Sequence, residues 1–173
     1  MRAYCIGAFV AVTLAFSLSA SANTTYLKHF HGSICVPTNG SRNIVDYNQY
    51  GITDISGSTT AWFRCGLSRT EAPVANETLM NVIATVYDRH PSASNEVACT
   101  LHVTDLGGND VITPITHYTS GSSSSSISLI FPFTEVGGTP LYDRLIMLEC
   151  MVPPIANGQS SHLTQIQVLS QTP

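Results

Sequence analysis

The sequence predicts an all-β protein, a two-sheet antiparallel sandwich that is Ig-like or jelly-roll-like, with a barrel as the second choice. Segments with period-two alternation of apolar and polar residues recur along the chain, separated by Gly-, Asn- and Ser-rich turns at intervals of roughly ten residues. Only 10% of the 173 residues are charged and 43% are hydrophobic. This composition excludes a charge-driven disordered chain and a coiled coil. No segment shows a convincing amphipathic helix pattern.

About nine strands are expected, four of them from strong patterns, at residues 80–88, 96–105, 127–133 and 144–152. Within residues 96–105 one face carries only apolar residues: Val97, Cys99, Leu101 and Val103. Residues 144–152 place Ile146, Leu148, Cys150 and Val152 on one face, and residues 127–133 do the same with Ile127, Leu129, Phe131 and Phe133. Five weaker strands are expected at residues 33–36, 43–52, 59–67, 111–118 and 162–169.

The first 22 residues are expected to be a signal peptide, and residues 23–173 a single secreted domain. Arg2 supplies a positive end, residues 6–18 are mostly apolar, and Ala20-Ser21-Ala22 has the small-x-small form of a cleavage site. We therefore expect cleavage after Ala22 and a location that is secreted, periplasmic or at the cell surface. The apolar stretch is too short for a spanning helix, and no later window approaches the roughly 20 residues required.

Cleavage would leave four cysteines, which in an exported chain indicate two disulfides. Their wide spacing offers no C-x2-C pair for zinc, so no metal and no cofactor is expected. Cys99 and Cys150 both lie on apolar faces of strong strands, which favours the pairs Cys99–Cys150 and Cys35–Cys65. Alternation alone leaves the other two connectivities open.

The chain resembles a group of small exported four-cysteine proteins of myxobacteria and other proteobacteria. Six framework motifs carry this resemblance: Cys35-Val36-Pro37, Tyr50-Gly51-Ile52, Phe63-Arg64-Cys65-Gly66-Leu67, Val86-Tyr87-Asp88-Arg89, Val97-Ala98-Cys99-Thr100-Leu101 and Leu148-Glu149-Cys150-Met151-Val152-Pro153. The resemblance runs from about Cys35 to the final strand. It implies export and a β-sandwich, and it implies no catalytic or binding residues.

The charge balance and the motifs exclude several function classes. Seven Lys and Arg against eleven Asp and Glu give a net charge of -4, so the chain lacks the basic surface that nucleic acid requires. No G-x-S-x-G motif is present to mark a serine hydrolase, and we expect no catalytic residue.

Trp62 is the strongest candidate for a binding residue. If Phe63, Cys65 and Leu67 face the core, alternation turns Trp62 and Arg64 outward. With Tyr47 and Tyr50, which are further candidates, Trp62 would form an aromatic platform for sugar rings or a protein partner. The alternative is a tryptophan covered by a crossing loop.

Three other clusters have both a functional and a structural interpretation. His29 and His31 would share a strand face as half of a metal site, or form a surface pair. Residues 105–110 are calcium-like in composition, but their Asp and Asn residues are also typical of a tight turn. Residues 88–90 (Asp, Arg, His) are either an acid/base cluster or an exposed ion pair before a proline, and the ion pair is favoured.

The sequence thus predicts an exported, non-catalytic β-sandwich that binds a glycan or a protein or contributes to an envelope or extracellular structure. The alternative is a secreted hydrolase acting on glycans, with catalytic residues scattered along the sequence. A polar cleft with a perturbed carboxyl or imidazole group would favour the hydrolase, and an exposed aromatic face would favour binding.

Overall fold

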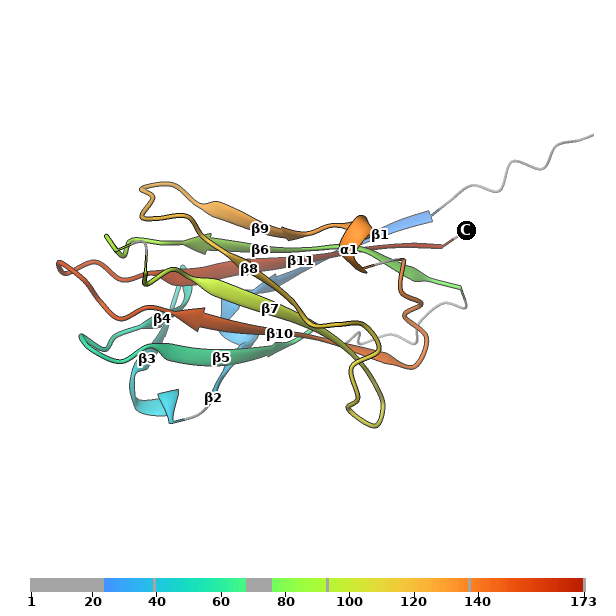
Figure 1. The fold of residues 1–173 in the computed structure, drawn as a ribbon, viewed down its shortest axis with the longest axis horizontal. Helices are drawn as coiled ribbons and strands as arrows, with labels where there is room; N and C mark the ends of the chain where they lie inside the picture. The colour runs from blue at the N-terminus through green and yellow to red at the C-terminus, as the bar shows by residue number, and fades with distance from the viewer. Residues whose placement is uncertain (1–23, 39, 68–75, 93, 137, 173) are drawn as a thin grey trace, which may run out of the picture.

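Two antiparallel sheets pack face to face in the computed structural model, which describes residues 24–38, 40–67, 76–92, 94–136 and 138–172 (Figure 1). The predicted signal peptide lies outside the described residues. Within them there are eleven strands, so the predicted two-sheet antiparallel sandwich is confirmed.

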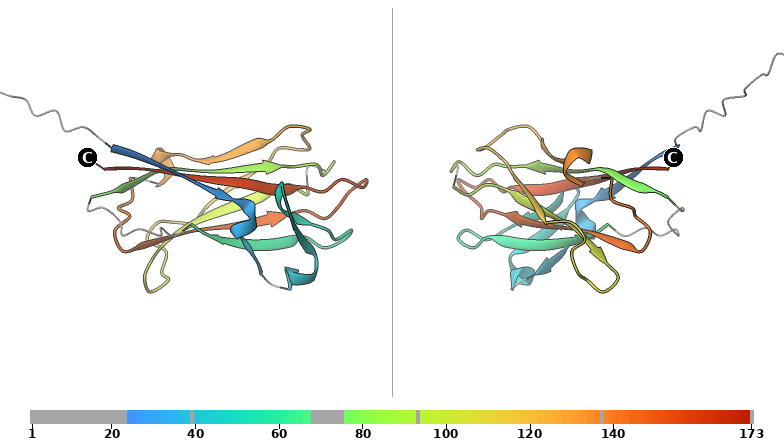
Figure 2. Two further views of the ribbon diagram at one scale, coloured as in Figure 1. Left: turned by 180° about the vertical axis from the view of Figure 1, so that it is seen from behind. Right: turned by 45° about the vertical axis from the view of Figure 1, so that its right-hand side comes forward.

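The six-stranded sheet has the order β3-β4-β11-β6-β9, and β1 also pairs with β11. Its strands are β1 (Thr24–His31), β3 (Val45–Asn48), β4 (Gly51–Asp54), β6 (Thr78–Tyr87), β9 (Ile127–Phe131) and β11 (His162–Thr172). The long strand β11 is central, and β4 and β1 occupy successive parts of the same edge of it. Figure 2 shows β1, in blue, alongside β11, in red.

The five-stranded sheet has the order β2-β5-β10-β7-β8. Its strands are β2 (Val36–Thr38), β5 (Ala61–Gly66), β7 (Ala98–Asp105), β8 (Ile115–Tyr118) and β10 (Arg144–Val152). Burial alternates residue by residue along β5, because successive side chains point to opposite faces of a sheet. The expected inward set is therefore confirmed here, with Phe63, Cys65 and Leu67 buried.

The core fills the space between the two sheets. The alternating apolar residues predicted for β7 and β10 are all buried, and they meet an apolar face of the other sheet. Fully buried side chains from that second layer include Leu79, Val82, Val86, Leu163 and Ile166. Burying such side chains is the main stabilising contribution to a sandwich of this kind.

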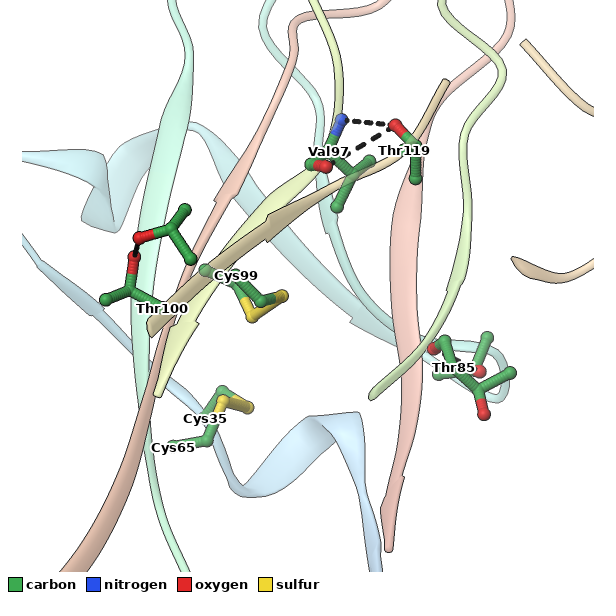
Figure 3. The surroundings of a disulfide bond; sticks show 10 residues. Cys35, Cys65, Thr85, Val97, Cys99, Thr100 and Thr119 are labelled. Carbon is green, nitrogen blue, oxygen red and sulfur yellow. Dashed lines mark hydrogen bonds between the residues drawn. A yellow bond between two sulfur atoms is a disulfide. The ribbon is translucent and has the colours of Figure 1, made fainter. Parts of the chain in front are cut away.

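Both predicted disulfides are present and buried in the core (Figure 3). Cys99 and Cys150 are direct partners in the β7–β10 register, and their Cα atoms are 4.1 Å apart. Cys35, just before β2, bonds Cys65 on the neighbouring β5. Each disulfide therefore joins adjacent strands of the five-stranded sheet.

The strand predictions need three corrections. Residues 43–52 were expected to form one strand, but the chain reverses there and forms the β3–β4 hairpin, with Gly51 at φ +122°. Strand β1 was not among the nine strands expected, although a strand at residues 29–31 was one interpretation of the two histidines. Phe133 does not continue β9 inward: it begins the short helix α1 (Phe133–Val136) and is 47% exposed.

Besides α1, the part of the chain that the structure describes contains two 3-10 turns, η1 (Gly32–Ile34) and η2 (Ser41–Asn43). Among the described residues, no helix is long and apolar enough to cross a membrane.

Candidate functional site

A groove crosses one end of the outer face of the six-stranded sheet. It consists of two adjoining hollows of about 550 and 460 Å³ that share Tyr50 and Tyr87. Three segments far apart in sequence form the first hollow: the β3–β4 turn, the end of β6 and the loop that enters β11, which meet at the left of Figure 1. Strand β1 contributes to the second hollow. We call these two hollows together the tyrosine groove.

Strand register brings the aromatic side chains of the groove together. Tyr87 is the last residue of β6 and pairs directly with His162, the first residue of β11, so both side chains point outward. Their ring centroids are 4.9 Å apart. The ring of Tyr50, carried on the β3–β4 turn, lies 6.1 Å from the His162 ring. The groove floor is therefore an aromatic surface.

The surroundings of His162 favour the neutral form of its ring. Burial lowers its pKa, and the charge of nearby Arg89 lowers it further, while a hydrogen bond that the ring donates to the Ser160 backbone opposes both effects. A neutral imidazole offers a flat face together with one donor and one acceptor, which suits contact with a polar ligand.

The second hollow continues the groove over β1 and β11 with polar groups. His29 and His31 share the outward face of β1, as the alternation predicts, and they pair with Gln167 and Gln165. His31 Nε2 lies 3.3 Å from the carbonyl oxygen of Gln49, and His29 Nδ1 contacts the Gln165 amide. No group of three or more metal-ligating side chains occurs among the residues that the structure describes.

Asp88 does not form the exposed ion pair with Arg89 that was favoured from the sequence. The Asp88 side chain is fully buried, and its two oxygens accept four hydrogen bonds. The donors are the backbone N–H groups of His90 and Val97 and the hydroxyls of Thr119 and Ser161. Alternation turns Arg89 the other way, into the tyrosine groove.

The structure separates the four residues predicted as ligand-binding candidates. Trp62 (38% exposed) and Arg64 lie on the outer face of the five-stranded sheet, where Arg64 Nε donates to Glu149 at 3.0 Å. The Tyr47 hydroxyl donates to the backbone carbonyl of Cys35 at 2.9 Å. Tyr50 alone lies in the tyrosine groove, on the opposite outer face from Trp62.

Residues 105–110 form a tight turn. Asp105 accepts hydrogen bonds from both the backbone and the side-chain amide of Asn109, and these bonds lower the pKa of its carboxyl group. This is the local side chain to backbone bonding expected of Asp and Asn in turns.

Sequence reasoning missed Tyr87, Arg89 and His162 as members of one site. Each lies at or beside a strand end, where an aromatic or charged residue on the solvent face is the available signal. That signal says nothing about pairing, because only the β6–β11 register places Tyr87 opposite His162.

No protein-family model and no curated protein matches the chain. Among solved structures, the xylan-binding module CBM15 is 6% identical at a TM-score of 0.46, covering 86% of this chain and 97% of that one. The isomalto-dextranase of Arthrobacter globiformis T6, complexed with panose, is 8% identical (TM-score 0.49; 82% of this chain, 23% of that one). A family two carbohydrate esterase from Cellvibrio japonicus is also 8% identical (TM-score 0.42; 88% and 36%).

Proposed function

We propose that this protein is an exported, non-catalytic β-sandwich module that binds a glycan in the tyrosine groove. The observation that carries the proposal is the cluster of Tyr50, Tyr87 and His162 rings in an open groove lined by amide and hydroxyl side chains. Flat rings suit the apolar faces of sugars, and amides and hydroxyls suit sugar hydroxyl groups.

The groove lining favours binding over hydrolysis. The described lining residues include no Asp or Glu, whereas glycoside hydrolysis generally uses a pair of carboxylates. A perturbed imidazole is present in His162, whose pKa is lowered by burial, but the described lining residues supply no carboxylate to act with it.

Export is supported by the two disulfides, which persist in oxidising compartments. We expect the secreted or periplasmic protein to begin at Asn23, one residue before β1. N-terminal sequencing or intact mass spectrometry of the protein recovered from its native compartment would check this, and a mass that includes residues 1–22 would contradict it.

The binding proposal predicts that Tyr50→Ala weakens glycan binding by about tenfold or more, because the change removes one wall of the aromatic surface. A glycan array followed by isothermal titration calorimetry would measure the effect, with circular dichroism to check folding. Tyr50 is 58% exposed, so its truncation should leave the core intact.

Two further variants make this test specific. Tyr142→Ala is the matched control, because Tyr142 is equally exposed (60%) and lies outside the groove. Trp62→Ala tests the opposite face. If Trp62→Ala lost glycan binding and Tyr50→Ala kept it, the ligand would lie on the face that carries Trp62. Absence of binding to every glycan by the folded wild type would overturn the glycan proposal.

A further inference from the structure

Arg89 is a side chain of the tyrosine groove that has a buried hydrogen-bond donor without an acceptor among the described residues. Its side chain follows β6 on the outward face, and its guanidinium carbon lies 5.7 Å from the centroid of the Tyr87 ring. The Nε atom is buried and has no hydrogen-bond partner, and no ion pair to the guanidinium group occurs within the described residues. A buried donor on a charged group that lacks an acceptor is costly, so such a group favours a ligand that supplies one.

The surroundings of Arg89 leave that position open to an anion. Arg89 is the one formally charged side chain at neutral pH among the described lining residues, and the others are aromatic, imidazole, amide and hydroxyl groups. The adjacent carboxylate, Asp88, points into the core, where its oxygens are occupied by four donors. The groove is therefore locally positive in a chain whose net charge is -4.

The position of Arg89 also fixes where the anion would lie. Its guanidinium group stands over the Tyr87 ring, and the Tyr87 ring packs against His162. A sugar ring that covers this aromatic surface would carry its substituents to the guanidinium edge. A planar guanidinium pairs with a carboxylate through two parallel hydrogen bonds, which neutral amides cannot reproduce.

We infer that the tyrosine groove recognises an acidic glycan, and that Arg89 binds the carboxylate of a uronic acid residue stacked on the aromatic surface. This inference rests on the proposed glycan-binding function and narrows it to one substrate class.

The test compares polymers that differ only in their charge. Oligosaccharides of polygalacturonate, alginate and hyaluronan would be titrated calorimetrically at pH 7 and low salt, each beside its carboxyl-reduced neutral form. We expect at least one acidic form to bind ten or more times more tightly than its reduced counterpart. The preference should shrink as salt is raised, because screening weakens charge pairing.

Variants of Arg89 assign the preference to this residue. Arg89→Gln should reduce the difference between acidic and reduced forms to below twofold, while Arg89→Lys, which keeps the charge but not the planar fork, should retain part of it. Arg144→Gln removes a cation outside the groove and should bind like the wild type. Circular dichroism and thermal melting would confirm that each variant is folded.

The outcomes separate this inference from the proposed function. Equal affinity for acidic and reduced forms, or for Arg89→Gln and the wild type, would overturn the acidic-glycan inference and leave a neutral-glycan groove. If the protein bound dextran sulfate tightly and bound none of the uronates, the assignment of Arg89 to a carboxylate would be overturned. Absence of binding to acidic, reduced and neutral glycans alike would overturn both the inference and the proposed function.

Discussion

Gly51 shows how closely the chain approaches itself beside the groove. A Cβ atom at this position would lie 1.9 Å from the carbonyl oxygen of Leu163, and the backbone φ is +122°. A Cβ atom at Gly32, just after β1, would lie 2.1 Å from the same carbonyl oxygen. Glycine at these two positions therefore lets the end of β1 and the β3–β4 hairpin approach β11 closely. Because the hairpin carries Tyr50, this contact also positions one wall of the groove.

Gly51→Ala is therefore expected to destabilise the fold by about 3 kcal/mol or more, through both the backbone strain and the clash with Leu163. Gly57→Ala is the matched control, since nothing lies within 4 Å of an added Cβ there, and its effect should stay within about 0.5 kcal/mol. Urea denaturation followed by circular dichroism would measure both. Equal stabilities for the two variants would contradict the close approach.

Asp54 makes the stability depend on pH. It is fully buried, its Oδ2 atom has no hydrogen-bond partner among the described residues, and burial raises its pKa from 3.8 to about 6 despite backbone bonds from Ser56 and Ala61. Because the folded-state pKa is the higher one, protonation stabilises the fold. That contribution is fully present below pH 3.8 and is lost as the pH rises through about 6.

Asp54→Asn should remove this dependence. We expect the variant to gain stability relative to the wild type as the pH rises from 4 to 7, by up to about 3 kcal/mol. Denaturant titrations at pH 4, 5.5 and 7 would measure the gain, with Asp46→Asn on the exposed part of the same hairpin as the control. Stability curves for Asp54→Asn and the wild type that stay parallel over this range would rule the explanation out.

Strands with a regular apolar face, including the edge strand β9, could be predicted from the sequence, and β1 could not. In β7 and β10 every second residue is apolar, so alternation identifies both the strands and the inward cysteines. Strand β1 mixes Lys28, His29 and His31 with apolar residues, because an edge strand is half solvated and needs no such pattern. The β3–β4 reversal lacks a strong turn dipeptide, so residues 43–52 resemble one strand.

The groove was less predictable than the fold for a related reason. Tyr50 was predicted only as part of an aromatic platform with Trp62, which the structure places on the opposite outer face. Its partner rings come from β6 and β11, whose adjacency is a property of the sheet order alone. Sequence patterns identify which face a side chain occupies, but they leave open which strands become neighbours.

The Cys99–Cys150 bond joins two central strands that already share eight register pairs. Replacing both cysteines by alanine should lower the free energy of unfolding by about 2–5 kcal/mol, because the cross-link restricts the unfolded chain over a separation of 51 residues. Denaturation of the double variant beside the wild type would measure this. A loss below about 1 kcal/mol would show that the unfolded chain gains little freedom when the bond is removed.

The Asp88 hydrogen-bond network connects the two layers of the sandwich and lies directly behind the groove. Its donors come from the segments that follow β6, lead into β7, leave β8 and enter β11, so one carboxylate connects four segments from both sheets. Figure 3 shows the part of this network between Val97 and Thr119. Arg89 and His162 each follow directly after a member of the network, Asp88 and Ser161.

Asp88→Asn should therefore affect stability and ligand binding together. Replacing one acceptor oxygen by an amide leaves buried donors unsatisfied, which we expect to lower the free energy of unfolding by about 1–3 kcal/mol. Affinity for the bound glycan should fall several-fold although Asp88 is fully buried, because Arg89 and His162 lose their fixed positions. Denaturation and calorimetric titration of the same preparation would measure both, with Asp110→Asn, exposed and remote from the groove, as the control. A destabilised but folded Asp88→Asn protein with unchanged affinity would show that the groove keeps its geometry without the network.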